Sequence, residues 1–314
     1  MSRKIIIDCD PGIDDAIALV MALFDPRLNV LAITPTAGTI EADVATHNVA
    51  ALLSALDPPR YPRLGTARPS ENAAVMDDRD LHGSDGLGEV RLPASPRQHS
   101  TPSEKVMGDL LQQHPGEITI VCLGPLTNLA RLCQFEPTAV ELIDKVVISG
   151  GCVSVPGNAS PVAERNMHFD PVAAERVLSS ALTKQMVPLD VTDEVTFGVE
   201  LLEQLPSKYS RAGALLHKWL PFAFRTAHQK LGREVIPLYD PTTLVAAIDP
   251  EAFTWETVAG KVETKGRWTS GMTVFDRRLR GDWAENLDVA VGVDEEHVRQ
   301  CIVQGLRYAG AATD

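Results

Sequence analysis

The sequence lacks the features that would place the protein in a membrane, on nucleic acid or in a disulfide framework. No apolar run approaches the roughly 18 residues that a membrane-spanning helix needs. The 29 lysines and arginines are outnumbered by 42 aspartates and glutamates, and the net charge of −13 argues against nucleic acid or an anionic membrane as a partner. The 5 cysteines contain no Cys-x-x-Cys pair, so their spacing indicates neither a zinc site nor a disulfide framework.

The beginning of the sequence also lacks the pattern of a signal peptide. Residues 2–4 lead directly into Ile5, Ile6 and Ile7, which form the apolar centre of an expected strand. Reduced thiols in a cytoplasmic protein are the simplest account of an odd number of scattered cysteines. We therefore expect a cytoplasmic protein.

The size and pattern of the chain predict an α/β fold. A chain of 314 residues with 44% hydrophobic residues can bury a large core. The continuous apolar run 5–7 suits a strand that is buried on both faces, and helical spacing follows it. Residues 29–34 and 118–123 indicate further strands, and a helix is expected at about 41–56. These alternating elements predict an open, doubly wound, mostly parallel sheet flanked by helices, with a Rossmann-like core. No linker or repeat divides the sequence, so we expect one domain over residues 1–314.

An acidic cluster follows the first expected strand. Asp8, Asp10, Asp14 and Asp15 lie within eight positions, at a strand end, a Pro-Gly turn and a helix start. Ligands of open α/β sheets bind at the carboxyl ends of strands. A helix N-terminus stabilises some negative charge, but four crowded carboxylates are costly unless a cation joins them. Ligands that are all oxygen favour calcium or magnesium over zinc.

Two loops carry further polar candidates. The glycine-rich loop 80–88 presents His82, the polar group that we expect to point into a site; the alternative is a surface loop with an incidental histidine. The loop 150–166 carries Asn158, Glu164 and Asn166, which suit a polyhydroxylated ligand because amides donate and accept while carboxylates accept from hydroxyls. Turn-forming asparagines and a solvated glutamate are the alternative reading of this loop.

Five segments, taken together and in order, resemble the inosine-uridine-preferring nucleoside hydrolases. The most specific is DCDPGIDDA at residues 8–16. The others are LGPLTN at 123–128, GN at 157–158, the E-x-N pair at 164–166 followed by DP at 170–171, and DP at 240–241. The resemblance covers essentially the whole chain. It implies a nucleoside hydrolase-like fold and Ca²⁺-dependent hydrolysis of the N-glycosidic bond of a small ribonucleoside, giving free base and ribose.

The resemblance also implies a metal site and a base. Ca²⁺ would be held by Asp10, Asp15, Asp240 and the backbone carbonyl of Leu123. Side-chain chemistry alone does not point to Leu123. A metal-activated water would attack the anomeric carbon, with Asp10 accepting its proton, through an oxocarbenium-like transition state. Asp8 would orient the site from behind.

The substrate-binding residues and the assembly state follow from the same resemblance. Asp14 would bind a ribose hydroxyl, and Asn158, Glu164 and Asn166 would hold the ribose. The family forms dimers and tetramers, so we expect a homo-oligomer.

Two positions depart from the family pattern. Tyr239 stands where many members have a histidine that is thought to protonate the leaving base, and Tyr, with a pKa near 10, is a poorer donor at neutral pH. Thr39 stands where many members have an asparagine that contacts ribose. Aromatic stacking can replace the general acid in other members. The aromatic residues and histidine at 219–235 fit a core better, although a minority could line a pocket over the base.

Two alternatives to this function remain open. Asp8-Cys9-Asp10 also resembles the nucleophile strand of haloacid dehalogenase-type phosphatases, with Asp8 as nucleophile and Mg²⁺ as metal; the sequence has no convincing set of their later motifs. The second is a nucleoside- or ribose-binding protein that keeps the metal site and has lost or altered turnover. Thr39 and Tyr239 keep this second alternative open.

Overall fold

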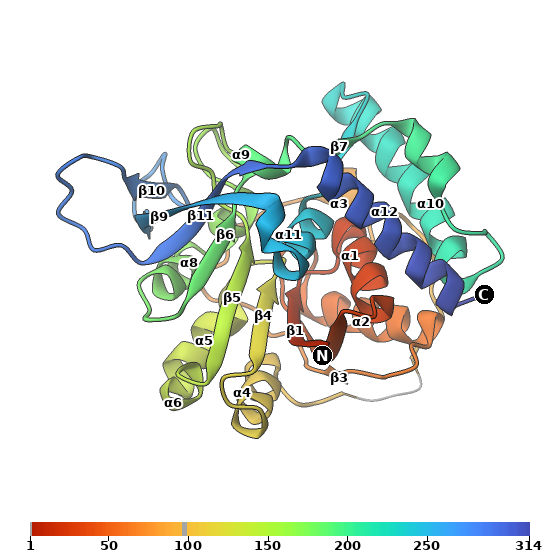
Figure 1. The fold of residues 1–314 in the computed structure, drawn as a ribbon, viewed down its shortest axis with the longest axis horizontal. Coiled ribbons are helices and arrows are strands. Elements are labelled where there is room, and N and C mark those ends of the chain that lie inside the picture. Colours follow the sequence, from red (N-terminus) through yellow and green to blue (C-terminus); the bar gives the residue numbers. More distant parts are fainter. Residues whose placement is uncertain (1, 96–98) are drawn as a thin grey trace.

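A single large sheet organises the computed structural model, which describes residues 2–95 and 99–314 (Figure 1). The sheet has nine strands in the order β10-β9-β11-β6-β5-β4-β1-β2-β3. Its strands are β1 (Arg3–Cys9), β2 (Leu28–Pro35), β3 (Arg63–Leu64), β4 (Ile118–Cys122), β5 (Ile143–Ser149), β6 (Lys184–Val187), β9 (Phe253–Val262), β10 (Thr273–Asp276) and β11 (Leu287–Val293). A separate antiparallel pair joins β7 (Thr196–Phe197) to β8 (Ile236–Pro237).

Helices cover both faces of the sheet, and Figure 1 shows the two groups on opposite sides. One face packs against α1 (Ile13–Phe24), α2 (Ala42–Leu56), α10 (Arg211–Thr226), α11 (Tyr239–Ile248) and α12 (Glu295–Ala312). The other packs against α4 (Ser103–Gln113), α5 (Thr127–Phe135), α6 (Pro137–Val140) and α8 (Pro171–Leu178). Short helices complete the described chain: α3 (Arg79–His82), α7 (Arg165–Phe169), α9 (Leu189–Thr192), η1 (Val199–Gln204), η2 (Ala227–Leu231) and η3 (Pro250–Ala252).

The strand β1 lies in the middle of the sheet, which explains its unbroken apolar run. It pairs in parallel with β2 on one side and β4 on the other. Successive side chains of a strand point to opposite faces. Ile5 and Ile7 accordingly pack in the core beneath α1 and α11, whereas Ile6 packs in the core on the opposite face. The prediction of a strand buried on both faces is confirmed.

The sheet is mostly parallel, as predicted, with an antiparallel extension at one end. Strands β1 to β6 pair in parallel with one another, and β11 pairs in parallel with β6, whereas β9 pairs antiparallel with both β11 and β10. The parallel strands β1, β4, β5 and β6 therefore end at one edge, which we call the carboxyl edge. The turns after these strands are brought together there.

The long segment between α2 and α4, which includes the glycine-rich loop 80–88, contains little regular structure. Its described part contributes the short strand β3 and the single-turn helix α3, whose last residue is His82. Within the described ranges, no helix is both long and apolar enough to cross a membrane.

The central position of β1 predicts a large cost for truncating its side chains. Replacing Ile7, which is fully buried, with alanine leaves a cavity and should lower the free energy of unfolding by about 2–5 kcal/mol. Val199→Ala, at a residue with 62% exposure, is the control and should change it by less than about 0.5 kcal/mol. Chemical denaturation of both variants measures the difference, and equal effects would contradict the central placement of β1.

Candidate active site

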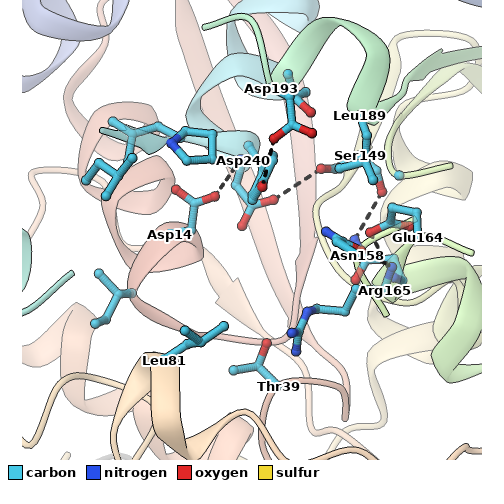
Figure 2. Close-up of a pocket in the computed structure, with 18 of the residues that line it drawn as sticks. Asp14, Thr39, Leu81, Ser149, Asn158, Glu164, Arg165, Leu189, Asp193 and Asp240 are labelled. Carbon is cyan, nitrogen blue, oxygen red and sulfur yellow. Dashed lines mark hydrogen bonds between the residues drawn. The ribbon is translucent and has the colours of Figure 1, made fainter. Parts of the chain in front are cut away.

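A cavity of about 550 Å³ opens at the carboxyl edge of the sheet (Figure 2). Its walls come from the turns after β1, β4, β5 and β6, from α3 and α10, and from the first residues of α11. Every residue that the sequence analysis assigned to catalysis, substrate or metal lines it: Asp10, Asp14, Asp15, Thr39, His82, Leu123, Asn158, Glu164, Asn166, Tyr239 and Asp240. The fold thus gathers residues from positions 10 to 240 in one cavity.

The acids of the cavity are withdrawn from solvent. Asp10 and Asp15 are each 3% exposed and Asp240 is 6% exposed. Burial raises the pKa of Asp14 and of Asp15 to about 7. Burial, followed by repulsion from Asp15, raises the pKa of Asp10 and of Asp240 well above the usual range. Buried carboxylates of like charge hold their ionised forms at a high cost, so the site favours a positive group.

Backbone amides hold Asp10 and Asp15 at the start of α1. Asp15 accepts hydrogen bonds from the amides of Gly12, at 3.0 Å, and of Asp10, at 3.2 Å. The Oδ2 of Asp10 accepts from the amide of Thr39 at 2.6 Å. A Cβ atom added to Gly124 would lie 2.3 Å from the Oδ1 of Asp10, so the turn after β4 needs glycine to leave room for this carboxylate.

Asp14 and Asp240 are joined across the cavity. The amide of Asp240 donates to the Oδ2 of Asp14 at 3.0 Å, and the hydroxyl of Ser149 donates to the Oδ1 of Asp240 at 3.2 Å. The second oxygen of Asp14 is buried without a hydrogen-bond partner among the described residues. An orphaned buried carboxylate oxygen is the kind of atom that a ligand hydroxyl or a cation satisfies.

The type of donor atom suits a hard cation, but the oxygen atoms do not surround a single point. The acids and the Leu123 carbonyl are all oxygen donors. Yet in the described chain the one trio of ligand atoms that all lie within 4.8 Å of one another is Asp249, His297 and Cys301, away from the cavity. The ligand atoms of Asp10, Asp15 and Asp240 are further apart than this, so they would have to move closer together to share an ion.

The expected ribose-binding residues line the cavity, and hydrogen bonds to the backbone fix their positions. Glu164 caps α7 and accepts from the amides of Asn166 at 2.9 Å and Gly151 at 3.0 Å. The Asn166 amide group donates to the carbonyls of Leu123, at 2.6 Å, and Ser149, at 3.1 Å. Glu164 is therefore buried and engaged rather than solvated, and burial raises its pKa to about 7.

Asn158 is fixed in the same way, by the loop that it belongs to. Its side-chain oxygen accepts from the amide of Arg165 at 2.9 Å. Because α7 begins at Arg165, this bond ties the loop after β5 to the helix start. Figure 2 shows Asn158 and Glu164 beside Arg165 on the same side of the cavity.

His82 lines the cavity as expected, and it is a neutral histidine. Its Nδ1 accepts from the amide of Ile13 at 3.1 Å, so the proton of the neutral ring lies on Nε2. Burial lowers the pKa of His82 to about 4. His82 can therefore donate a hydrogen bond near pH 7 but carries no spare proton there.

Tyr239 is the first residue of α11, and its hydroxyl proton is used in a hydrogen bond. Its hydroxyl donates to the Oδ1 of Asp193 at 3.1 Å, and Arg233 pairs with the same oxygen at 3.6 Å. Burial, followed by the charge of Asp193, raises the pKa of Tyr239. These features weaken it further as a proton donor.

Sequence reasoning missed Arg165, Asp193 and Arg233, which also line the cavity. Arg165 occupies the middle of the E-x-N segment, where its position could have drawn attention. Its guanidinium forms an ion pair with Asp78, which joins the loop before α3 to α7, and it favours the ionised form of Asp10. Asp193 and Arg233 carried no sequence signal.

The possibility that an aromatic residue of 219–235 stacks over the base is not supported. Trp219 and Phe224 are buried in the core, as expected from the sequence, and His228 pairs with Glu234 at the surface. Small and aliphatic residues of the same segment line the cavity instead: Ala223, Thr226, Ala227 and Leu231.

Asp8 does not occupy the position of a nucleophile. It is fully buried behind the cavity, and the Nδ2 of Asn128 donates to its Oδ1 at 2.8 Å and to the Pro35 carbonyl at 2.9 Å. Burial raises the pKa of Asp8 to about 7. This placement removes the basis of the phosphatase alternative.

Known proteins with similar sequences and structures extend over the full chain. The family model described as inosine-uridine preferring nucleoside hydrolase matches residues 5–300. The pyrimidine-specific ribonucleoside hydrolase RihA of Salmonella enteritidis PT4 is 36% identical over 312 residues, which cover 98% of this chain and 99% of that protein. The plant nucleoside hydrolase PpNRh1 has a TM-score of 0.88 at 33% identity, with 98% of this chain and 99% of that one covered.

Two further solved structures show the same fold. The purine-preferring ribonucleoside hydrolase from Gardnerella vaginalis has a TM-score of 0.91 at 26% identity and covers 99% of each chain. An inosine-uridine preferring nucleoside hydrolase from Bacillus anthracis has a TM-score of 0.75 at 17% identity, with 97% of this chain and 99% of that one covered. These matches confirm the predicted fold and the resemblance. The chain belongs to the inosine-uridine preferring nucleoside hydrolase family.

Proposed function

We propose that this protein, a ribonucleoside hydrolase, cleaves the N-glycosidic bond with the help of a Ca²⁺ ion in the cavity at the carboxyl edge. The observation that carries the metal proposal is the group of buried carboxylates with oxygen-only chemistry, including the orphaned oxygen of Asp14. Asp10, Asp15, Asp240 and the Leu123 carbonyl would hold the ion. When bound, Ca²⁺ supplies Lewis-acid activation of water and a grip on vicinal hydroxyls.

In this proposal Asp10 is the base. Its carboxylate accepts a proton from the attacking water. The water oxygen forms a bond to the anomeric carbon while the carbon–nitrogen bond breaks, and the electron pair of that bond leaves with the nucleobase. The reaction requires an ionised carboxylate next to the water. Burial and the charge of Asp15 raise the pKa of Asp10, and the guanidinium of Arg165 offsets this only in part, so the ionised form would depend on the bound cation.

The remaining residues orient the ribose. Asp14 accepts a hydrogen bond from a ribose hydroxyl through its free oxygen, and Thr39 contacts the same sugar through its hydroxyl. Asn158, Glu164 and Asn166 are held by backbone hydrogen bonds, so they meet the sugar with little loss of side-chain entropy. Their dipoles and charge stabilise the positive sugar of the transition state.

In this proposal the departure of the nucleobase depends little on Tyr239. Its proton is bound to Asp193, so its part is to position the Asp193–Arg233 pair at the cavity wall. Neutral His82 contributes to catalysis as a hydrogen-bond donor through Nε2–H. Since the similar proteins include both a pyrimidine-specific and a purine-preferring hydrolase, we propose ribonucleosides as the substrate class.

A nucleoside-binding protein with lost or altered turnover is the second candidate. The observation that favours it is the engaged proton of Tyr239. We further propose a cytoplasmic homo-oligomer, dimer or tetramer, on the family resemblance and on the free thiols of all the described cysteines.

Release of free ribose tests the function. We expect release from at least one of inosine, adenosine, guanosine, uridine and cytidine, abolition of release by a calcium chelator, and recovery on addition of Ca²⁺. Asp10→Asn should lower kcat by at least roughly 10²-fold because it removes the base. Asp43→Asn, at an exposed residue of α2, is the matched control and should keep the wild-type rate.

Each outcome of this assay decides one part of the proposal. Turnover that survives the chelator would exclude the metal, and a wild-type rate in Asp10→Asn would exclude that base. Tight nucleoside binding without release of ribose would favour the binding protein.

Tyr239→Phe tests the role of the hydroxyl. Because this proton is held by Asp193, we expect kcat to fall less than tenfold, whereas loss of a true general acid costs roughly 10²–10⁴-fold. Steady-state kinetics on the best substrate measure the difference, with Tyr209→Phe, at an exposed tyrosine, as the control. A fall beyond 10²-fold would identify Tyr239 as the proton donor.

A further inference from the structure

Three potential metal ligands meet at the far end of α11 from the cavity. Asp249 follows the last residue of α11, and His297 and Cys301 lie four residues apart on α12, so they share one face of that helix. Their ligand atoms all lie within 4.8 Å of one another. The helices α11 and α12 pack against each other, and none of the three side chains is among those that line the cavity.

One ring nitrogen of His297 faces both other groups. Its Nε2 lies 2.8 Å from the Oδ2 of Asp249 and 3.5 Å from the Sγ of Cys301. A neutral imidazole has a single N–H, so this nitrogen can donate to only one of the two. A metal ion bound by the nitrogen, the sulfur and the oxygen would satisfy all three.

The spacing suits a tetrahedral ion. With bonds of about 2.0 Å to nitrogen and 2.3 Å to sulfur, ligands of a tetrahedral zinc ion lie roughly 3.5 Å apart. The nitrogen–sulfur separation of 3.5 Å already has this value, while the nitrogen–oxygen separation of 2.8 Å would have to lengthen by less than about 1 Å. The side chains of His297 and Asp249 are 45% and 34% exposed, so solvent can reach a fourth position.

We propose that Asp249, His297 and Cys301 bind a divalent transition-metal ion of the zinc class, with one position open to solvent. One nitrogen, one sulfur and one carboxylate oxygen form a donor set typical of zinc, whereas calcium requires oxygen alone. The site is distinct from the proposed calcium site in both place and chemistry.

The charges around the trio are compatible with a dication. The guanidinium of Arg27 interacts with the Cys301 thiol and would by itself oppose a cation. Asp25 neutralises it through two hydrogen bonds, of 2.9 Å to Nε and 2.6 Å to Nη2. Asp249 and a Cys301 thiolate then leave two negative charges to balance the ion.

The ion would link two helices that pack on the same face of the sheet. Since α11 carries Tyr239 and Asp240 at its first turn, a metal at its other end fixes it to α12 without touching the substrate. We therefore expect the metal to raise the melting temperature and to leave kcat nearly unchanged.

Co²⁺ replaces zinc as a coloured probe in the test. Full-length protein in excess Ca²⁺, under reducing conditions, should take up one Co²⁺ with the near-ultraviolet absorption of a cobalt–thiolate bond, and Zn²⁺ should displace it. Cys301→Ser should abolish the band. Cys133→Ser, at the other cysteine that is partly exposed, should retain it and serves as the matched control.

Asp249→Asn provides a variant that keeps the thiol and the imidazole. Loss of this ligand should lower the affinity for Zn²⁺ by at least roughly tenfold. Loss of a residue that only hydrogen-bonds to a metal ligand already lowers metal affinity by about 10–100-fold. The band should persist in Asp15→Asn, which alters only the cavity. A missing band in the wild-type protein, or a band that survives Cys301→Ser, would overturn the proposal, whether or not nucleosides are hydrolysed.

Discussion

Four acids of like charge are crowded together at the carboxyl edge of the sheet, and the fold has to accommodate their repulsion. Water screens the charges of these acids poorly. Each carboxylate accepts a hydrogen bond from a backbone amide or a hydroxyl: Asp10, Asp14, Asp15 and Asp240. Such a group lowers the stability of the folded state unless it is protonated or joined by a cation. The large core on both faces of the sheet offsets this cost, and the proposed function makes use of it.

The fold turns this constraint into a site because parallel strands end together. The turn after β1 supplies the first acids, and the turn after β4 supplies the Leu123 carbonyl. The loop after β5 supplies the sugar-facing group, which includes Asn158 and Glu164. Asn166 binds the carbonyls at the ends of β4 and β5, so it sets the distance between the proposed metal side and the sugar side. A single amide thus couples two parts of the cavity.

The sequence predicted the sheet and the acidic cluster because both are local patterns. The isoleucines of β1 and the aspartates that follow lie in one short segment, so strand, turn and helix could be placed from spacing alone. Long-range partnerships could not. The pairs Arg165–Asp78 and Tyr239–Asp193 join residues tens of positions apart, and Leu123 contributes only a backbone carbonyl. The spacing of the cysteines did not indicate that Cys301 lies beside Asp249, because Asp249 follows α11 whereas Cys301 belongs to α12. An aromatic residue of 219–235 over the base remained possible from the sequence, but helix α10 turns Trp219 and Phe224 into the core.

If one cation gathers the acids of the cavity, a crystal structure of the protein grown with Ca²⁺ should show it. We expect one ion within about 2.3–2.6 Å of oxygens from Asp10, Asp15 and Asp240 and of the Leu123 carbonyl. A cavity that holds only water at saturating Ca²⁺ would rule out the shared cation.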